Sequence, residues 1–219
     1  MIITKVTPAR WQQAQEWERE ISKRIAAKGD DYNMWWAVRF DGYKVLKGLH
    51  FENVLEVGCG PCTNSRLILP LIKHTNLYLE DPLLAKYITA SNPVAALPAR
   101  HLLLPLEHLM LDDASVNLVI CINVLDHVQD AEKCMERMTR VLAPGGVLII
   151  GQDLSNAEDY ELCPESWQDV GHPIKLDRAF FDDRLNGFTP LYDVTLTREQ
   201  GRNPKCHYGT MLWIGAKHG

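Results

Sequence analysis

A glycine-rich loop directly follows a buried apolar run in the first third of the chain. The run Val54–Val57 leads into Gly58–Gly60, and a segment of helical composition comes next. Such a loop lets a ligand approach the backbone closely, because glycine has no Cβ and accepts positive φ. A dinucleotide-binding loop would place a third glycine at Thr63, and Pro61 removes one of the amides that would hold a pyrophosphate. The loop therefore favours an adenosyl ligand without phosphates over a nicotinamide or flavin dinucleotide.

A carboxylate follows the next apolar run, where the ribose of such a ligand would need it. Asp81 lies 23 residues beyond Gly58, close to the spacing of about 20 at which an acid usually reaches ribose hydroxyls. Glu80 competes for the same role, because the end of the preceding strand is uncertain by one residue. Asp81-Pro82 could also be only a turn that starts a helix. The spacing predicts that one of these two acids binds the sugar.

Three histidines follow predicted strands and could take part in proton transfer. His127 comes after the fourth predicted strand, His172 lies in the long connection after the fifth, and His207 opens the last strand. Ligands of an open parallel sheet bind beyond the carboxyl ends of its strands, so all three start on the ligand side. A histidine suits a base that deprotonates a hydroxyl or an amine. His172 is the first candidate for the catalytic residue, and Asp126 and His127 are the second. The alternative for each histidine is a purely structural role.

Polar and aromatic side chains in two further segments could enclose a small acceptor. The long connection after the fifth predicted strand carries Asp153 and Tyr160. Near the N-terminus, Tyr32, Trp35 and Trp36 could close as a lid that excludes water and faces a cationic ligand with its rings. The alternative is that these rings only pack an N-terminal helix onto the sheet.

The elements that must position these residues alternate between short apolar runs and helix-length segments. This alternation indicates crossover units and a parallel sheet that is buried on both faces. Strands are predicted at Asn53–Val57, Asn76–Glu80, His101–Leu104, Asn117–Ile122, Gly146–Gln152, Phe188–Thr197 and Cys206–Ala216. Helices are predicted at Pro8–Ala27, Asn33–Leu49, Asn64–Lys73, Leu83–Ala90, Ala131–Leu142 and Asp177–Leu185. The connection between the last two strands is too short for a crossover helix, so this pair must be antiparallel.

The composition fits one ordinary globular domain. The chain has 219 residues, 46% of them hydrophobic, and a net charge of −5. With this acidic balance, the chain has no run of basic residues that could contact the phosphates of a nucleic acid. Its apolar stretches are too short to cross a membrane. Six cysteines are too few for a disulfide framework, and the N-terminus lacks a signal-like leader. We expect a soluble, cytoplasmic protein that is a monomer or homodimer and needs no structural metal.

Five motifs, taken in order, resemble those of the class I S-adenosylmethionine-dependent methyltransferases over roughly Asn33 to the C-terminus. The matching pieces are Glu56–Gly60, Asp81, Leu109–Val119, Ile122–Val128 and Val141–Gly146. The last piece is the most telling, because a proline just after a helix and two glycines before a buried strand suit a tight helix-to-strand turn. Each motif alone is weak evidence, whereas the ordered set is strong.

The resemblance implies a Rossmann-like, doubly wound α/β fold whose seven-stranded sheet is mostly parallel with an antiparallel last strand. A helical cap or lid at residues 1–50 would precede a cofactor-binding domain at residues 51–219, in one structural domain overall. S-Adenosylmethionine would be the cofactor and S-adenosylhomocysteine the product. The residues expected at the cofactor are Glu56, Gly58, Cys59, Gly60, Asp81, Pro82, Leu106, Glu107 and Asn123. Two departures weaken the adenine assignment: Cys62 replaces the third glycine, and Pro105 replaces a common acid.

Methylation of a small polar metabolite is the function that the resemblance implies. The segment after the fourth predicted strand, Asn123–Asp126, lacks the Asn/Asp-Pro-Pro-aromatic run of enzymes that methylate amino groups of nucleic-acid bases or protein glutamine. The first alternative is a cyclase or lyase that attacks the cofactor's own carbon chain and releases methylthioadenosine. Another is a catalytically silent binding subunit.

The segment Cys59–Cys62 reads Cys-Gly-Pro-Cys, which is also the active-site sequence of thioredoxin-like oxidoreductases. A thiol-disulfide oxidoreductase is therefore a third alternative. A tryptophan normally precedes that motif where this chain has Gly58, and nothing in such a fold explains Asp81. No second pair at zinc spacing follows, so no metal is expected. Reversible oxidation of Cys59 and Cys62 that blocks ligand binding is a further hypothesis.

Overall fold

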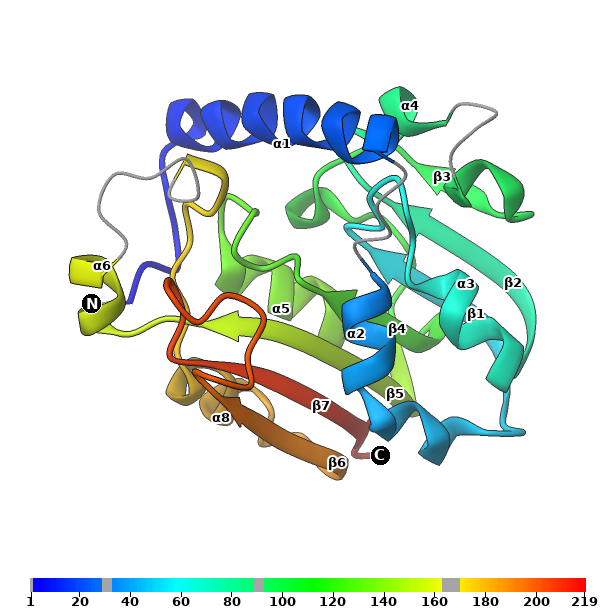
Figure 1. Cartoon of the computed structure of the whole chain (residues 1–219). Helices are drawn as coiled ribbons and strands as arrows, with labels where there is room; N and C mark the ends of the chain where they lie inside the picture. Colours follow the sequence, from blue (N-terminus) through cyan, green and yellow to red (C-terminus); the bar gives the residue numbers. More distant parts are fainter. Residues whose placement is uncertain (1, 29–32, 89–92, 163–169) are drawn as a thin grey trace.

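A seven-stranded sheet forms the centre of the computed structural model, which describes residues 2–28, 33–88, 93–162 and 170–219 (Figure 1). The strands are β1 His50–Val57, β2 Lys73–Glu80, β3 Arg100–Leu102, β4 Val116–Ile122, β5 Leu142–Leu154, β6 Phe188–Thr197 and β7 Gly209–Lys217. Their order across the sheet is β3-β2-β1-β4-β5-β7-β6. The five strands from β3 to β5 are parallel, whereas β7 runs antiparallel to both β5 and β6. The predicted doubly wound fold with an antiparallel last strand is confirmed.

The helices agree with the sequence where the apolar period is long and fall short where it is interrupted. The α-helices are α1 Pro8–Lys28, α2 Met34–Arg39, α3 Ser65–Ile68, α4 Leu84–Tyr87, α5 Ala131–Val141, α6 Ala157–Leu162 and α8 Arg178–Arg184. The 3-10 helices are η1 Asp41–Leu46, η2 Leu69–Leu71, η3 Pro93–Ala96 and η4 Leu106–His108.

Three predicted helices are wrong in extent. Among its described residues, the segment predicted at Leu83–Ala90 is helical only over α4, which ends at Tyr87 with Ile88 as its C-cap. The segment predicted at Asn33–Leu49 divides into α2 and η1, and the segment predicted at Asn64–Lys73 keeps only α3 and η2 before Lys73 enters β2. Pro70 lies at the start of η2, where its ring cannot continue an α-helix.

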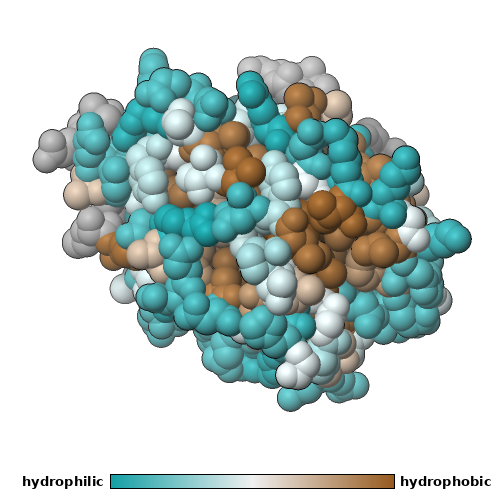
Figure 2. Space-filling view, turned by 90° about the horizontal axis from the view of Figure 1, so that it is seen from below, coloured by the Kyte–Doolittle hydropathy of each residue, from teal (hydrophilic) through white to brown (hydrophobic). Residues whose placement is uncertain are grey.

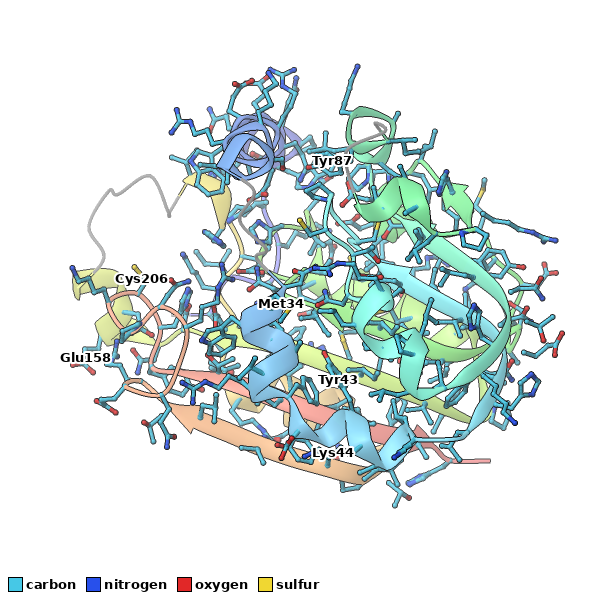
Figure 3. All side chains as sticks on the ribbon, turned by 45° about the vertical axis from the view of Figure 1, so that its right-hand side comes forward. Met34, Tyr43, Lys44, Tyr87, Glu158 and Cys206 are labelled. Atoms are coloured by element: carbon cyan, nitrogen blue, oxygen red, sulfur yellow. The ribbon has the colours of Figure 1, made fainter. Side chains whose placement is uncertain are left out.

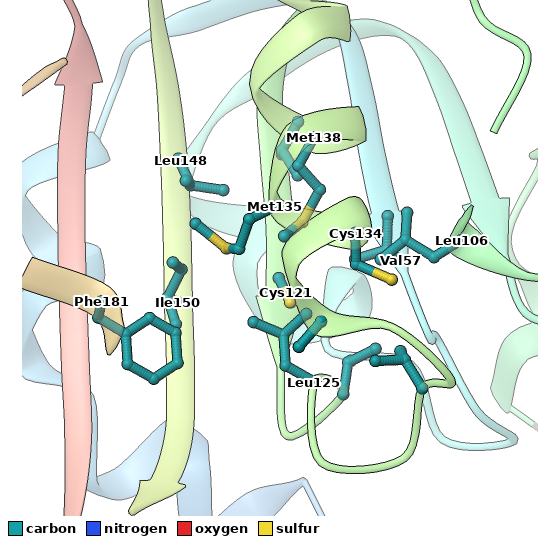
Figure 4. Packing of buried hydrophobic residues seen from close by; sticks show 14 of the residues in the cluster. Val57, Leu106, Cys121, Leu125, Cys134, Met135, Met138, Leu148, Ile150 and Phe181 are labelled. Carbon is teal, nitrogen blue, oxygen red and sulfur yellow. The ribbon is translucent and has the colours of Figure 1, made fainter. Parts of the chain in front are cut away.

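Side chains alternate between the two faces of the sheet and build two hydrophobic clusters. On β4, Val119 and Cys121 point into one cluster, and Leu118 and Ile120 point into the other. The first cluster packs α5 and α8 against β4 and β5; Figure 4 shows Met135, Met138 and Phe181 among its members. Both faces of the central strands are thus buried, as expected for a parallel sheet.

The second cluster contains part of the predicted N-terminal cap. Trp36, Phe40 and Leu46 are almost completely buried there with Ile120 and Leu212 of the sheet. Trp36 thus has the packing role that was the alternative to a lid, because its indole lies against Gly151 and Ile122 in the core. The division of the chain at residue 50 stays a prediction.

One face of the molecule is partly apolar. Figure 2 shows hydrophobic side chains gathered within a polar surround on the side that carries α2, η1 and β6 in Figure 1. Large exposed hydrophobic residues in these elements are Met34, Val38, Val45 and Leu191. Among the described residues, no helix combines the length and apolarity needed to cross a lipid bilayer.

Candidate functional site

A cavity of about 370 Å³ opens beyond the carboxyl ends of β1, β2 and β4. It lies where the strand order reverses, since β1 pairs with β2 on one side and with β4 on the other. Such a switch point is where open α/β sheets bind ligands, and the volume lies within the range of small-molecule sites. Its lining combines the glycine loop after β1, the acids that end β2, η4, the residues after β4 and one face of α1.

The two glycines of the loop have different tasks. Gly58 and Gly60 both have positive φ, 54° and 55°. A Cβ on Gly58 would lie 2.6 Å from the Val124 side chain, so this glycine lets the loop approach the residues after β4. A Cβ on Gly60 would meet nothing within 4 Å, and Gly60 lines the cavity. The open space beside Gly60 is therefore available to a ligand.

Glu56 does not line the cavity but binds the backbone that follows this loop. Its carboxylate accepts hydrogen bonds from the Asn64 amide at 2.6 Å, the Ser65 amide at 2.9 Å and the Thr63 hydroxyl. Burial raises the pKa of Glu56, and these donors act against that rise. The predicted cofactor residue Glu56 is thus placed as an anchor of the turn that carries Gly58 and Gly60.

Glu80 and Asp81 both line the cavity, and both contact the glycine loop. Glu80 Oε2 accepts from the Gly58 amide at 3.1 Å, and Asp81 Oδ2 accepts from the Gly60 amide at 3.0 Å. Asp81 Oδ1 accepts from the Leu83 amide at 2.7 Å, whereas Glu80 Oε1 is buried without a hydrogen-bond partner among the described residues. Burial raises the pKa of Asp81 to about 6 and raises that of Glu80 well above its usual range.

The neighbouring loop and η4 complete this side of the cavity. Cys59, Pro82 and Leu106 line it together with Glu107. Glu107 Oε1 already accepts the amides of Gln129 and Asp130, at 2.7 and 3.0 Å, which ties η4 to the start of α5. Burial raises the pKa of the Cys59 thiol well above its usual range, and the charges of Asp81, Glu56 and Glu80 raise it further.

The three residues predicted to be catalytic lie together on the other side of the cavity. Asp126 Oδ1 lies 3.6 Å from His127 Nε2, and Asp126 Oδ2 lies 3.9 Å from His172 Nε2. The two imidazole rings are 4.5 Å apart between centroids. Asn123, with φ of 58°, places its side-chain amide 3.5 Å from His127 Nε2. His127, His172 and Asn123 line the cavity, with Asp126 buried behind them.

This cluster is held by elements far apart in the sequence. His127 Nδ1 lies 2.9 Å from the Gly171 carbonyl oxygen and 3.2 Å from Glu18 Oε1 on α1. Burial lowers the pKa of His127, but the carboxylates of Asp126 and Glu18 outweigh it and raise the pKa to about 9. Burial acts to raise the pKa of Asp126, but the positive charges of His127 and His172 together act against it. As a result, the pKa of Asp126 lies below its usual range.

Of the remaining predicted acceptor and lid residues, those that the structure describes do not line the cavity. Asp153 is buried and accepts from the Thr210 hydroxyl at 2.6 Å. His207 lies 3.1 Å from the Ser155 hydroxyl, and burial lowers its pKa to about 4. Trp35 is half-buried against Trp36. Tyr32 and the side chain of Tyr160 lie outside the described residues, so their roles stay predictions.

One face of α1 was missed as part of the site. Trp11, Gln15, Glu18 and Ser22 line the cavity at intervals of three and four residues, the period of one helix face. Ser22 donates to Tyr87 at 3.2 Å, which joins α1 to α4; Figure 3 shows Tyr87 beside α1. This helical spacing is visible in the sequence, but a stripe of polar residues is equally typical of a helix face exposed to solvent. Arg202 and Asn203 also line the cavity, and their loop carried no signal.

Comparisons with known families and curated proteins agree with this geometry. A family described as "Methyltransferase domain" matches residues 55–150, which run from β1 into β5. Thiol S-methyltransferase TMT1B of Rattus norvegicus is 29% identical over 160 residues, which cover 66% of this chain and 63% of that protein. The Homo sapiens protein of the same name is 34% identical over 127 residues, covering 55% of this chain and 49% of that protein. The matches thus span less than two thirds of these relatives.

Solved structures share the fold over nearly the whole chain. N-methyltransferase NodS from Bradyrhizobium japonicum WM9, in complex with S-adenosyl-L-homocysteine, has a TM-score of 0.64 at 15% identity, covering 91% of this chain and 98% of its own. The [4+2]-cyclase SpnF has a TM-score of 0.68 at 14% identity, covering 100% and 99%. At these identities the likeness establishes the fold alone.

Proposed function

We propose that this chain, which matches the "Methyltransferase domain" family over residues 55–150, is a class I S-adenosylmethionine-dependent methyltransferase that binds S-adenosylmethionine in the cavity beside the glycine loop and methylates a small molecule. The observation that carries this proposal is that one cavity brings together the loop at Gly58 and Gly60, the acid Asp81 and the cluster of His127 and His172. The cofactor supplies a methyl group on an activated sulfonium. The chain's own residues must bind, orient and desolvate the reactants.

The cofactor side of the cavity suits the adenosyl group. Gly60 leaves open space beside the loop backbone, and an aromatic and apolar wall that includes Leu106 and Tyr87 surrounds it. We assign the ribose to Asp81, because its pKa of about 6 leaves it ionised at neutral pH. Glu80 Oε1 lacks a hydrogen-bond partner among the described residues and is the competing acceptor, but burial raises the pKa of Glu80 well above its usual range, which favours its uncharged form. Pro82, Cys59 and Asn123 complete the predicted contacts.

The acceptor side is the part of the cavity near His127 and His172. Both imidazoles line it, and the buried Asp126 behind them holds them by charge. We propose that this cluster positions the acceptor's reactive atom. Trp11 and Trp17 of α1 also line the cavity, so that α1 excludes water from the transfer.

A thiol is the acceptor to test first. Two curated relatives are thiol S-methyltransferases by name, and one of them matches two thirds of this chain. The exposed lining of the cavity is mainly apolar, which suits a small thiol.

Product analysis tests the proposal. The purified chain is incubated with S-adenosylmethionine alone, with small thiols and with a cell extract, and the nucleoside product is identified by mass spectrometry. Formation of S-adenosylhomocysteine that depends on an added acceptor supports methyl transfer. Methylthioadenosine formed without an acceptor would instead indicate a cyclase or lyase acting on the cofactor. Neither product under any condition would favour a silent binding subunit.

A further inference from the structure

The side chains of Asp126, His127 and His172 present two imidazoles and one carboxylate to a common point at the edge of the cavity. One ligand atom from each residue lies within 4.8 Å of those from the other two. We propose that these three residues bind a divalent transition-metal ion. The sequence predicts no metal site, because no motif of metal-ligand spacing links residue 126 to residue 172. The inference therefore departs from that expectation.

The distances between donor atoms are close to those of a coordinated ion. Two ligands bound to zinc at normal lengths and a tetrahedral angle lie about 3.4 Å apart. Asp126 Oδ1 and His127 Nε2 are 3.6 Å apart, and Asp126 Oδ2 and His172 Nε2 are 3.9 Å apart. Both separations exceed normal hydrogen-bond lengths and need only a few tenths of an ångström to reach the coordinated geometry. The pairs are thus spaced better for a shared ion than for direct hydrogen bonds.

Besides these distances, the buried and unsatisfied carboxylate of Asp126 points to a bound ligand. The residue is only 4% exposed, and neither carboxylate oxygen accepts a hydrogen bond of normal geometry from the described residues. Buried carboxylates are nearly always hydrogen-bonded or paired, because an isolated buried charge is costly. Asp126 is paired by charge with the two imidazoles at 3.6 and 3.9 Å, and a cation bound between the three side chains would supply the direct ligation that its oxygens lack.

The surroundings of His127 match those of a metal-bound histidine. Its Nδ1 faces the Gly171 carbonyl at 2.9 Å and Glu18 Oε1 at 3.2 Å. When Nδ1–H donates to these oxygens, Nε2 is the ring nitrogen that faces Asp126, and a bound metal ion would take the place of the Nε2 proton. Metal-binding histidines commonly donate their other ring nitrogen to a carbonyl or carboxylate, which fixes the ring and the tautomer. Glu18 also adds negative charge beside the site.

The donor set and its position suggest the kind of ion and its task. Two imidazole nitrogens and one carboxylate suit zinc, cobalt or nickel better than magnesium or calcium, which prefer oxygen ligands. Three protein ligands leave a coordination position open, and His127 and His172 face the cavity. That position would hold the acceptor's sulfur or oxygen. This task rests on the proposed function, whereas binding of the ion does not.

Metal binding is tested on the full chain without any methyl acceptor. After treatment with a chelator and its removal, the wild type is titrated with Zn²⁺ by calorimetry and with Co²⁺ by visible absorption. We expect one ion per chain and a Co²⁺ spectrum of nitrogen and oxygen ligation. Asp126→Asn and His172→Gln should each weaken binding by at least about tenfold to a hundredfold, and Glu18→Gln should weaken it less. His74→Gln, on an exposed residue of β2, is the matched control and should bind as the wild type does.

The proposal is overturned if the wild type binds no Zn²⁺, or if Asp126→Asn and His172→Gln bind it as tightly as His74→Gln. A strong near-ultraviolet thiolate band with Co²⁺ would place the ion on cysteines and would also overturn it. The wild-type Co²⁺ spectrum decides the question even if a variant fails to fold. S-Adenosylmethionine binding is measured separately in the presence of chelator. Its persistence without a metal signal would refute the metal site alone.

Discussion

Asp126 Oδ2 lies 3.9 Å from His172 Nε2, although one residue follows β4 and the other lies far beyond β5. The contact arises because β4 and β5 are parallel neighbours, so the connections at their carboxyl ends meet at one edge of the sheet. The backbone amide of Ile174 also donates to the Asp126 carbonyl at 3.2 Å, which holds the two connections together. The same edge carries the glycine loop, so cofactor and acceptor sides share one cavity.

Replacing Gly60 with alanine should weaken S-adenosylmethionine binding more than it weakens the fold. The new Cβ would occupy cavity space beside the ligand, and a non-glycine residue at φ of 55° costs about 1 to 2 kcal/mol. Gly48→Ala is the matched control, because Gly48 also has positive φ and open surroundings but does not line the cavity. Calorimetry should show weaker binding for Gly60→Ala only, with similar losses of thermal stability in both. Equal affinities would refute the assigned position of the ligand.

Binding of S-adenosylmethionine should weaken as the pH falls below about 6. Asp81 has a pKa of about 6 because it is buried, and only its ionised form accepts hydrogen bonds at both oxygens from a ribose. Titrations between pH 8 and pH 5 should show constant affinity near neutrality and a decline on the acid side. The Asp81→Asn variant should lack this decline. An unchanged affinity of the wild type at pH 5 would contradict the role of Asp81.

The contribution of Asp81 to the stability of the free protein should change in the opposite direction. Its folded pKa of about 6 exceeds the unfolded value of about 4, so the folded state binds the proton more tightly. Its contribution to the free energy of unfolding therefore increases as the pH falls from about 6 to about 4. We expect denaturant titrations to show a smaller acid-side loss of stability in the wild type than in Asp81→Asn. The reverse order would contradict the raised pKa.

Trp36→Ala should destabilise the protein severely, by about 3 to 5 kcal/mol. Trp36 is completely buried against Gly151 and Ile122, and its removal leaves a large cavity in the second hydrophobic cluster. Trp35→Ala, in the half-buried neighbour, serves as the comparison and should cost clearly less. Urea denaturation measures both. A small loss for Trp36→Ala would show that this ring does not belong to the core and would revive a lid role for it.

The chain should not reduce insulin disulfides. A nucleophilic thiol requires a lowered pKa, whereas burial raises that of Cys59 well above its usual range. Cys62 lines the cavity, and because Cys62→Ser replaces only the sulfur atom of its side chain, S-adenosylmethionine affinity should stay within about threefold of the wild type. A turbidity assay with insulin and dithiothreitol checks the first expectation, with thioredoxin as the positive control. Reduction that depends on Cys62 would support the oxidoreductase alternative. Whether mild oxidation blocks ligand binding stays a separate hypothesis.

The succession of strands along the chain and the position of the glycine loop could be predicted because they depend on local patterns. The alternation of apolar runs fixes the sheet, and the short connection before β7 requires an antiparallel pair. The polar face of α1 could not be assigned to the cavity, because Glu18 and Ser22 look like solvated residues until α1 is placed over the sheet. Asp153 and His207 start on the ligand side but turn toward Thr210 and Ser155, and strand position alone does not fix that direction.

The central claim is that this cavity binds S-adenosylmethionine with Asp81 on the ribose, and calorimetric titration of three proteins tests it most directly. We expect the wild type to bind, and Asp81→Asn to bind about tenfold to a hundredfold more weakly, because hydrogen bonds to a charged acceptor contribute about 1.5 to 3 kcal/mol. Glu80→Gln should stay within about threefold of the wild type. Absence of heat with the wild type, or equal affinities for the wild type and both variants, would contradict the account.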